Sequence, residues 1–257
     1  MVRVSTLTVR ELTVRFAGLT ALDAVSFTVE PGSVHAVIGP NGAGKSTCFN
    51  VLSGVYRATA GSVRFGGQEL TGLAPHRIAA LGVARTFQNI ALPPRATVAE
   101  SLLLGRHRLT RTGFVSAGLR LPAAAREARQ HLERVREIAA FVGLEDDLER
   151  PAGSLPYGKQ KLVELARALC MEPELLLLDE PVAGMNAEER RRTAAVVAGV
   201  RDSLGISIVL VEHDMGVVMR LADAVTVLDF GRRIAGGSPA EVQNDPAVVR
   251  AYLGAAT

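Results

Sequence analysis

The spacing of apolar and polar positions in the first third of the chain predicts β-strands. Residues 4–30 alternate between the two kinds of position up to a turn at Pro31-Gly32, which is the period of a half-buried strand. The residues that follow predict a short apolar strand, a helix after a glycine-rich loop, and a further strand with its turn, at residues 34–38, 47–52 and 62–67.

Apolar runs in the last third predict the buried strands of an α/β core, and they lie at residues 175–178, 206–211 and 224–228. Ser238 and Glu241 have the spacing of a capping box, with proline at the first helical position between them. Asp245-Pro246 repeats a helix start signal, and we expect this last helix to end at Gly254.

The segment from about 90 to 165 has helical spacing instead. Thr97 and Glu100 form a capping box that predicts a helix through Leu104. A second helix is predicted over residues 122–143, between a first-turn proline and a C-terminal glycine. Its predicted buried face consists of Ala125, Ala128, Leu132, Val135, Ala139 and Val142. We therefore expect a helical insertion in the α/β core.

Arginine is frequent between Arg106 and Arg136. This enrichment has two interpretations, a solvated helix face or a surface that faces lipid headgroups or a membrane partner. The sequence leaves both open.

The composition is that of a folded chain with a sizeable core, since 48% of the 257 residues are hydrophobic and 21% are charged. A net charge of +3, with no basic patch or recognition motif, does not indicate a nucleic-acid partner. Cys48 and Cys170 lie in apolar segments, so we expect buried, reduced thiols, as in cytoplasmic proteins. No signal peptide and no apolar run of about 18 residues is found, so any membrane role is expected through a partner.

The strongest chemical signal is a G-x-x-x-x-G-K-[ST] loop between a predicted strand and helix. Its glycines let backbone N–H groups surround phosphate oxygens, Lys45 reaches the terminal phosphates, and Ser46 supplies a hydroxyl to Mg²⁺. The residues expected to bind nucleotide are Gly39, Pro40, Asn41, Gly42, Ala43, Gly44, Lys45, Ser46 and Thr47.

Two acids follow the apolar run 175–178. Their position predicts that both lie at the carboxyl edge of the sheet, where α/β folds bind ligands. Asp179 is expected to hold Mg²⁺, and Glu180 to act as the general base that activates water. Alone, such a pair is ordinary; together with the phosphate loop it indicates a nucleotide-phosphate hydrolase.

The class of hydrolase is indicated by Leu155-Pro-Tyr-Gly-Lys-Gln160, a glycine-containing loop that opens an amphipathic helix. This segment resembles the signature motif of ATP-binding cassette (ABC) ATPases, which contacts the nucleotide bound to the other subunit of a dimer. The resemblance implies contacts across the dimer from Pro156, Tyr157, Gly158 and Lys159. The family signature usually has serine where this chain has Pro156, so a hydroxyl contact is missing.

The other elements of the family follow in order along essentially the whole chain. Phe16 matches the aromatic residue that stacks on adenine, and Gln88 the glutamine that joins metal and water to the membrane subunit. Residues 183–186 match the loop that links the two sites, although Asn186 replaces a common aspartate. His213 matches the switch histidine. The catalytic set implied by the resemblance is Glu180, His213, Lys45 and Gln88, and the metal set is Ser46, Gln88 and Asp179.

The resemblance implies a P-loop NTPase (RecA-like) α/β core with an N-terminal antiparallel β subdomain and an inserted α-helical subdomain. One ABC ATPase domain would span 1–257: a β subdomain with core over about 1–33 and 61–86, the helical insertion over about 90–165, and the remaining core and C-terminal helices over about 166–257.

Residues 84–89, Tyr157 and the ending 249–254 are similar to the ATPases of branched-chain amino-acid importers, in particular the longer of their two types. We expect ATP and Mg²⁺ as cofactors, and as partners a second ATPase subunit (identical or paralogous), transmembrane permease subunits and, indirectly, a solute-binding protein. The location would be cytoplasmic, at the inner face of the cell membrane. The alternative is a soluble ABC ATPase of DNA repair or translation, but such proteins usually carry coiled coils, zinc-binding cysteines or two cassettes. A regulator without turnover would require a damaged Glu180 or His213.

Overall fold

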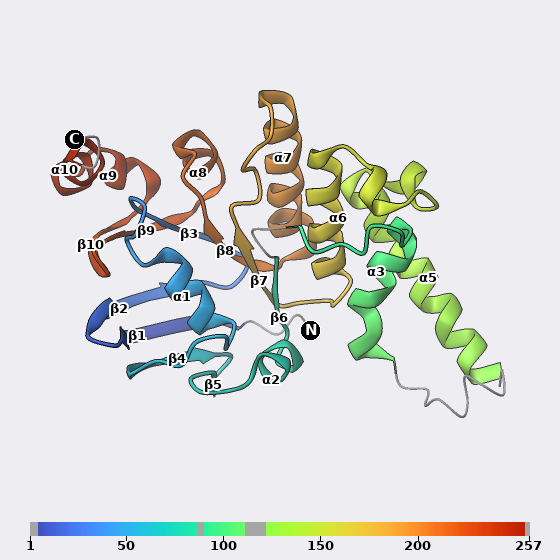
Figure 1. The fold of residues 1–257 in the computed structure, drawn as a ribbon, viewed down its shortest axis with the longest axis horizontal. Coiled ribbons are helices and arrows are strands. Elements are labelled where there is room, and N and C mark those ends of the chain that lie inside the picture. The colour runs from blue at the N-terminus through green and yellow to red at the C-terminus, as the bar shows by residue number, and fades with distance from the viewer. Residues whose placement is uncertain (1–4, 87–89, 111–121, 255–257) are drawn as a thin grey trace.

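The computed structural model describes residues 5–86, 90–110 and 122–254, and two β-sheets form its centre (Figure 1). The larger sheet has the strand order β10-β9-β3-β8-β7-β6, in which β10 is antiparallel to β9 and the other strands are parallel to one another. Its strands are β3 (Val34–Ile38), β6 (Val83–Arg85), β7 (Leu175–Asp179), β8 (Ser207–Val211), β9 (Ala224–Asp229) and β10 (Arg232–Gly237). The α/β core predicted from the apolar runs is confirmed.

The smaller sheet is antiparallel, with the order β2-β1-β4-β5. Its strands are β1 (Leu7–Phe16), β2 (Leu19–Val29), β4 (Ala60–Phe65) and β5 (Gln68–Glu69). Apolar residues of β1, β2 and β4 share one buried cluster with residues of β3, β7 and β8 and with helix α1 (Lys45–Leu52). The two sheets are therefore held together by one hydrophobic core, with α1 beside it.

A second buried cluster lies between the larger sheet and a group of helices. These are α3 (Val98–Arg106), α5 (Pro122–Val142), α6 (Tyr157–Leu169), α7 (Ala187–Leu204) and α8 (Met215–Leu221). At the other end of the sheet, α9 (Pro239–Gln243) and α10 (Pro246–Gly254) contribute to a third cluster with β3 and β9 (Figure 1). The other helices of the described residues are α2 (Pro75–Ala80) and the 3₁₀ turns His107–Leu109, Glu145–Asp147 and Ala152–Ser154.

The helix start signals are confirmed. Both bonds of the predicted capping boxes are present at Thr97 with Glu100 and at Ser238 with Glu241, and α10 has the predicted bounds. Two helices are longer than predicted. Helix α1 begins two residues earlier, at Lys45, directly after the left-handed Gly44, and α3 continues beyond Leu104 to Arg106.

The predicted buried face of α5 is wrong in its first half. Ala125 and Ala128 are exposed, whereas burial begins at Val135 and continues with Ile138, Ala139 and Val142. The physical reason is length: the first turns of α5 extend past the body of the molecule (Figure 1), so only its second half meets the core. Helical spacing identifies an apolar stripe but not how much of it a neighbour covers.

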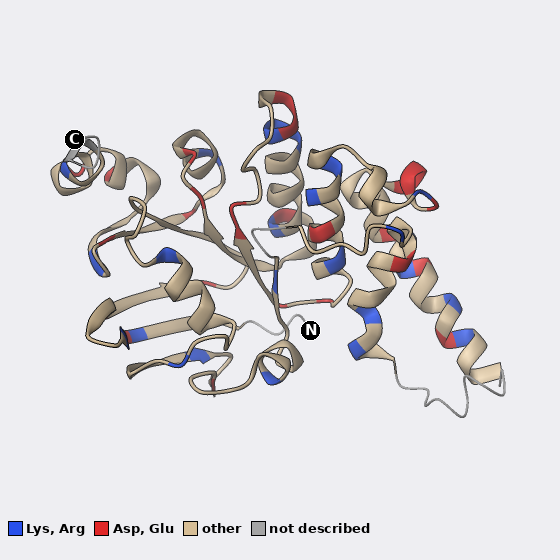
Figure 2. Cartoon of the chain, viewed as in Figure 1, with Lys and Arg blue, Asp and Glu red and all other residues tan. Residues whose placement is uncertain are grey.

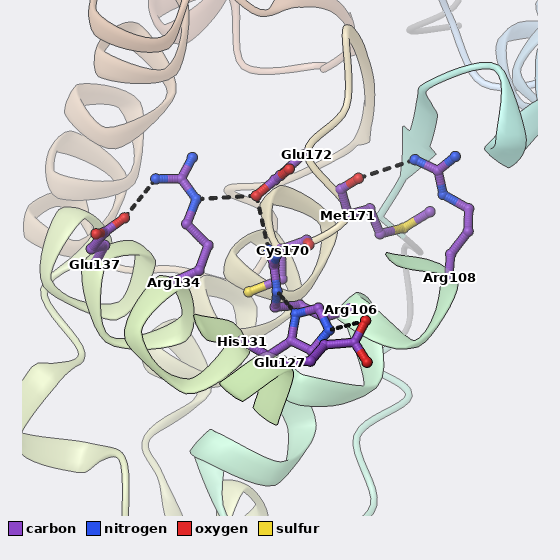
Figure 3. Close-up of polar contacts among 9 residues, drawn as sticks. All are labelled: Arg106, Arg108, Glu127, His131, Arg134, Glu137, Cys170, Met171 and Glu172. Carbon is purple, nitrogen blue, oxygen red and sulfur yellow. Dashed lines mark hydrogen bonds and ion pairs between the residues drawn. The ribbon is translucent and has the colours of Figure 1, made fainter. Parts of the chain in front are cut away.

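Several arginines of the basic stretch contact the protein itself (Figure 3). Arg106 is buried, and its Nε donates to Nδ1 of His131 at 2.8 Å, while its Nη1 donates to the Cys170 carbonyl and to Glu172 Oε1. Arg134 also pairs with Glu172. Acidic residues alternate with basic ones along α5 (Figure 2). These contacts join α3 and α5 to the turn between α6 and β7.

Cys48 and Cys170 are both buried and free, as predicted. Among the helices of residues 5–86, 90–110 and 122–254, none combines the length and the hydrophobicity of a membrane-spanning segment. His35 lies in β3, where its ring stacks on Phe27 and its Nε2 is 2.9 Å from Thr226 Oγ1. Burial, and to a smaller extent the charge of Arg233, lowers the pKa of His35 to about 4.

Candidate nucleotide site

The glycine-rich loop leaves the end of β3 in a conformation that only glycine tolerates at two positions. Gly39 has a φ of 149°, and a Cβ there would lie 2.0 Å from the Leu228 carbonyl oxygen. Gly44 has a φ of 101°, and its Cβ would lie 2.7 Å from the Ala21 carbonyl oxygen. The loop is thus pressed between β9 and β2, and its backbone N–H groups lead into the N-terminus of α1.

Lys45, at the start of α1, is buried against the same loop. Its Nζ donates to the carbonyl oxygens of Gly39 at 2.6 Å and Pro40 at 2.9 Å. Burial lowers the pKa of Lys45, and the charges of Glu180 and Asp179 oppose this shift. The ammonium group therefore lies close to the loop and within the field of both acids.

The loop borders a cavity of about 670 Å³. At Gly42, an added Cβ would meet no atom within 4 Å other than those of its chain neighbours, so the loop has open space at this position. Most of the predicted nucleotide-binding residues line it, together with residues from β1, β2, the end of β7 and the β9–β10 turn: Phe16, Leu19, Thr20, Ala21, Asn41, Gly42, Ala43, Gly44, Lys45, Ser46, Thr47, Glu180, Phe230 and Gly231.

The two predicted acids lie at the carboxyl edge of the larger sheet, as expected. Asp179 is the last residue of β7 and is buried. Glu180 follows with a φ of 48°, a left-handed conformation that is rare for residues other than glycine, and its N–H donates to the Val211 carbonyl at 2.9 Å. Its Oε1 is 3.8 Å from Nδ1 of His213, which follows the neighbouring strand β8. Glu180 and His213 thus meet although 33 residues separate them in sequence.

Arg85, the last residue of β6, is a site residue that the sequence analysis missed. Its Nη2 is 3.0 Å from Asp179 Oδ2, while its Nη1 donates to Asn50 Oδ1 at 2.7 Å and Ser53 Oγ at 2.8 Å. One guanidinium group thus joins Asp179 to the end of α1. The available signal was its place in Ala84-Arg-Thr-Phe-Gln-Asn, the segment already singled out for its glutamine.

Glu212, next to His213, is a second missed residue. It is completely buried, and its carboxylate accepts hydrogen bonds from the backbone N–H groups of Val182 and His213. Burial raises the pKa of Glu212, and these hydrogen bonds oppose the shift. Glu212 therefore connects the segment after Glu180 with the segment that carries His213.

The segment 155–160 forms the start of α6. Pro156 is the N-cap residue and makes no side-chain cap bond. The Tyr157 side chain is exposed, with its ring 5.9 Å from Lys161 Nζ, and the Lys159 ammonium pairs with Asp147 of the same chain. Of the described residues that line the cavity, none belongs to this segment.

The remaining predicted residues have different positions. Phe16 lines the cavity, and its ring contacts Tyr56 edge to face with the ring centroids 5.2 Å apart. Asn186 caps α7, and its side chain accepts from the N–H groups of Glu188 and Glu189, both at 3.0 Å. Gln88 lies outside the described residues.

Comparison with protein families gives two matches. Residues 22–183 match the family described as ABC transporter. Residues 232–257 match a shorter family described as branched-chain amino acid ATP-binding cassette transporter.

Similar proteins match over nearly the whole chain. The high-affinity branched-chain amino acid transport ATP-binding protein BraF of Pseudomonas aeruginosa is 41% identical over 97% of this chain and 98% of its own length. The corresponding protein LivG of Escherichia coli (strain K12) is 40% identical with the same coverage. Among solved structures, the ADP conformation of MJ1267, an ATP-binding cassette of an ABC transporter, has a TM-score of 0.84 and 31% identity, and the match covers 97% of this chain and 99% of that one.

Proposed function

Because this chain belongs to the ABC transporter family of ATP-binding cassettes, we propose that its ATP hydrolysis powers the import of branched-chain amino acids through a membrane permease. The observation that carries the hydrolytic part is the convergence of the phosphate loop, Asp179 and Glu180 on one sheet edge beside a cavity. The substrate is supported by BraF and LivG, which are named for branched-chain amino acid transport.

The roles of the residues follow from their positions. The loop N–H groups and Lys45 bind the terminal phosphates, which suits a buried ammonium group in contact with the loop. Glu180 accepts a proton from the attacking water, a role that suits its position in the lining of the cavity. His213, 3.8 Å from Glu180, orients the same water and the γ-phosphate.

The donor set also fits Mg²⁺, which takes oxygen ligands. Ser46 lines the cavity, and one oxygen of Asp179 is held by Arg85. Ser46, Asp179 and Gln88 would hold the ion, which neutralises phosphate charge when bound.

A second ATPase subunit, identical or paralogous, is part of the proposal. Nucleotide bound to that subunit would be contacted by Pro156, Tyr157, Gly158 and Lys159. This fits the observation that none of the four is among the described residues lining the cavity of their own chain. We further propose that the helical segment of about 90–165 acts as one subdomain. Together with Gln88 it would transmit permease movements to the site, at the cytoplasmic face of the membrane and downstream of a solute-binding protein.

Glu180→Gln tests the assignment directly. The variant keeps the shape of the side chain but cannot accept the proton, and loss of a general base typically slows hydrolysis about 10²–10⁴-fold. Gel filtration with Mg-ATP should show an ATP-containing dimer of the variant, while phosphate release is nearly abolished. Glu188→Gln, an acid at the start of α7 that does not line the cavity, is the control. Wild-type turnover by Glu180→Gln would refute the role of Glu180. Full turnover by a proven monomer would refute the shared site.

A further inference from the structure

The hairpin between β9 and β10 presents Phe230 at its tip. Phe230 is 88% exposed, the highest value among the large hydrophobic side chains that the structure describes. A phenyl ring exposed to water lacks the favourable free energy that burial of its apolar surface would give. The roles proposed for the phosphate loop, for the two acids and for the segment 155–160 do not explain why this side chain is exposed.

The turn itself is unfavourable for phenylalanine. Arg232 pairs with Asp229, so Phe230 and Gly231 form a two-residue loop, and both have positive φ angles, of 43° and 79°. Such turns favour asparagine, aspartate or glycine at both positions, because a bulky side chain is crowded at positive φ. Backbone strain of this kind concentrates at binding and catalytic sites.

The tip is also fixed in place. The Gly231 N–H donates to the Ala43 carbonyl of the phosphate loop at 3.1 Å, and the Asp23 N–H donates to the Gly231 carbonyl at 2.8 Å. A Cβ on Gly231 would lie 2.7 Å from the Ala21 carbonyl oxygen. The hairpin therefore cannot lift away without breaking contacts to both β2 and the loop.

Phe230, on this anchored turn, borders the cavity beside the phosphate loop. Phe230 and Phe16 line the same space as the loop residues 41–47, although they come from opposite ends of the chain. Aromatic rings bind nucleobases by stacking, and every base has a face for this contact. We propose that Phe230 is a second aromatic contact for the nucleoside part of bound ATP, beside Phe16. The inference rests on the proposed ATP-binding function and adds a residue to it.

Phe230→Asn is the informative variant, because asparagine suits the turn and lacks the ring. Isothermal titration would measure binding of ATP and of inorganic tripolyphosphate, which has no nucleoside. We expect the Kd for ATP to rise roughly threefold to tenfold, the Kd for tripolyphosphate to stay unchanged, and the Tm without ligand to stay level or rise. Leu204→Ala, an exposed apolar residue at the end of α7, is the control.

Each other outcome has a distinct meaning. Unchanged ATP binding by Phe230→Asn would overturn the inference. An equal loss for ATP and tripolyphosphate would also overturn it, because it would show that the hairpin braces the loop rather than contacting the nucleoside. Failure of the unaltered chain to bind ATP would instead overturn the proposed function, and this inference with it.

Discussion

Replacing Arg85 with methionine should strongly destabilise the chain in the absence of nucleotide. The side chains of Arg85 and Asp179 are only 13% and 6% exposed, and they approach to 3.0 Å. Removing the guanidinium group leaves a buried carboxylate without its ion-pair partner, which typically costs about 3–5 kcal/mol. For a chain of this size, that corresponds to a Tm lowered by roughly 6–20 °C.

Urea unfolding of the four combinations of Arg85→Met and Asp179→Asn would isolate the pair. Asp179→Asn removes the charge that Arg85→Met exposes, so the double variant should be less destabilised than the sum of the two single variants, by about 2 kcal/mol or more. Asn50→Ala is the matched control, since it removes one partner of Nη1 but leaves the ion pair intact. It should cost about 1–3 kcal/mol.

Two results would contradict this reasoning. One is a free energy of unfolding for Arg85→Met within about 1 kcal/mol of wild type, and the other is an equal effect of Asp179→Asn in both backgrounds. Either result would mean that Arg85 does not hold the aspartate, and that Asp179 is positioned by β7 alone.

Three further predictions follow from other parts of the molecule. Lys45→Ala should weaken ATP binding and abolish turnover together, because we propose that its ammonium group contacts the phosphates before and during the reaction; titration calorimetry that shows wild-type affinity would contradict this. Pro156→Ser should modestly tighten ATP-dependent dimerisation, because the serine would supply a hydroxyl group to the phosphates bound by the partner subunit. Light scattering in the Glu180→Gln background would detect the tighter association. Unchanged or weaker association would mean that the backbone makes this contact. The pKa of His35 in the folded chain, about 4, lies below the ordinary value of 6.5. As the pH falls, the unfolded chain therefore binds a proton at His35 before the folded chain does. The free energy of unfolding should fall by about 3 kcal/mol between pH 6.5 and pH 4. In His35→Gln this part of the acid sensitivity should vanish in urea titrations, and an unaltered pH profile would show that His35 is not its source.

Sequence reasoning succeeded where the determining contacts are local. The capping boxes at Thr97 and Ser238 join residues three positions apart, so the residue types alone specify them. The phosphate loop is a continuous motif whose glycines are required by backbone geometry. In both cases, the same few neighbouring residues determine both the conformation and the chemistry.

Contacts between distant segments could not be predicted in this way. Arg85 and Asp179 are 94 residues apart, and they meet because β6 and β7 are neighbours in the sheet. No local pattern specifies that order of strands. The exposure of Ala125 and Ala128 likewise depends on where the neighbouring helices end, which the spacing along α5 does not contain.

The position of β3 in the larger sheet has a consequence for how the protein is made. β3 and the phosphate loop occupy residues 34–47, yet the described strands that pair with β3 are β8 and β9, and the loop is braced by Leu228 and Gly231. β3 therefore lacks both of these neighbours until residues 207–229 have been synthesised. Because contacts between such distant segments form slowly, we expect the loop to gain this support late in folding. A chain truncated before residue 224 would carry the glycine-rich motif without Leu228 and Gly231, which lie against it.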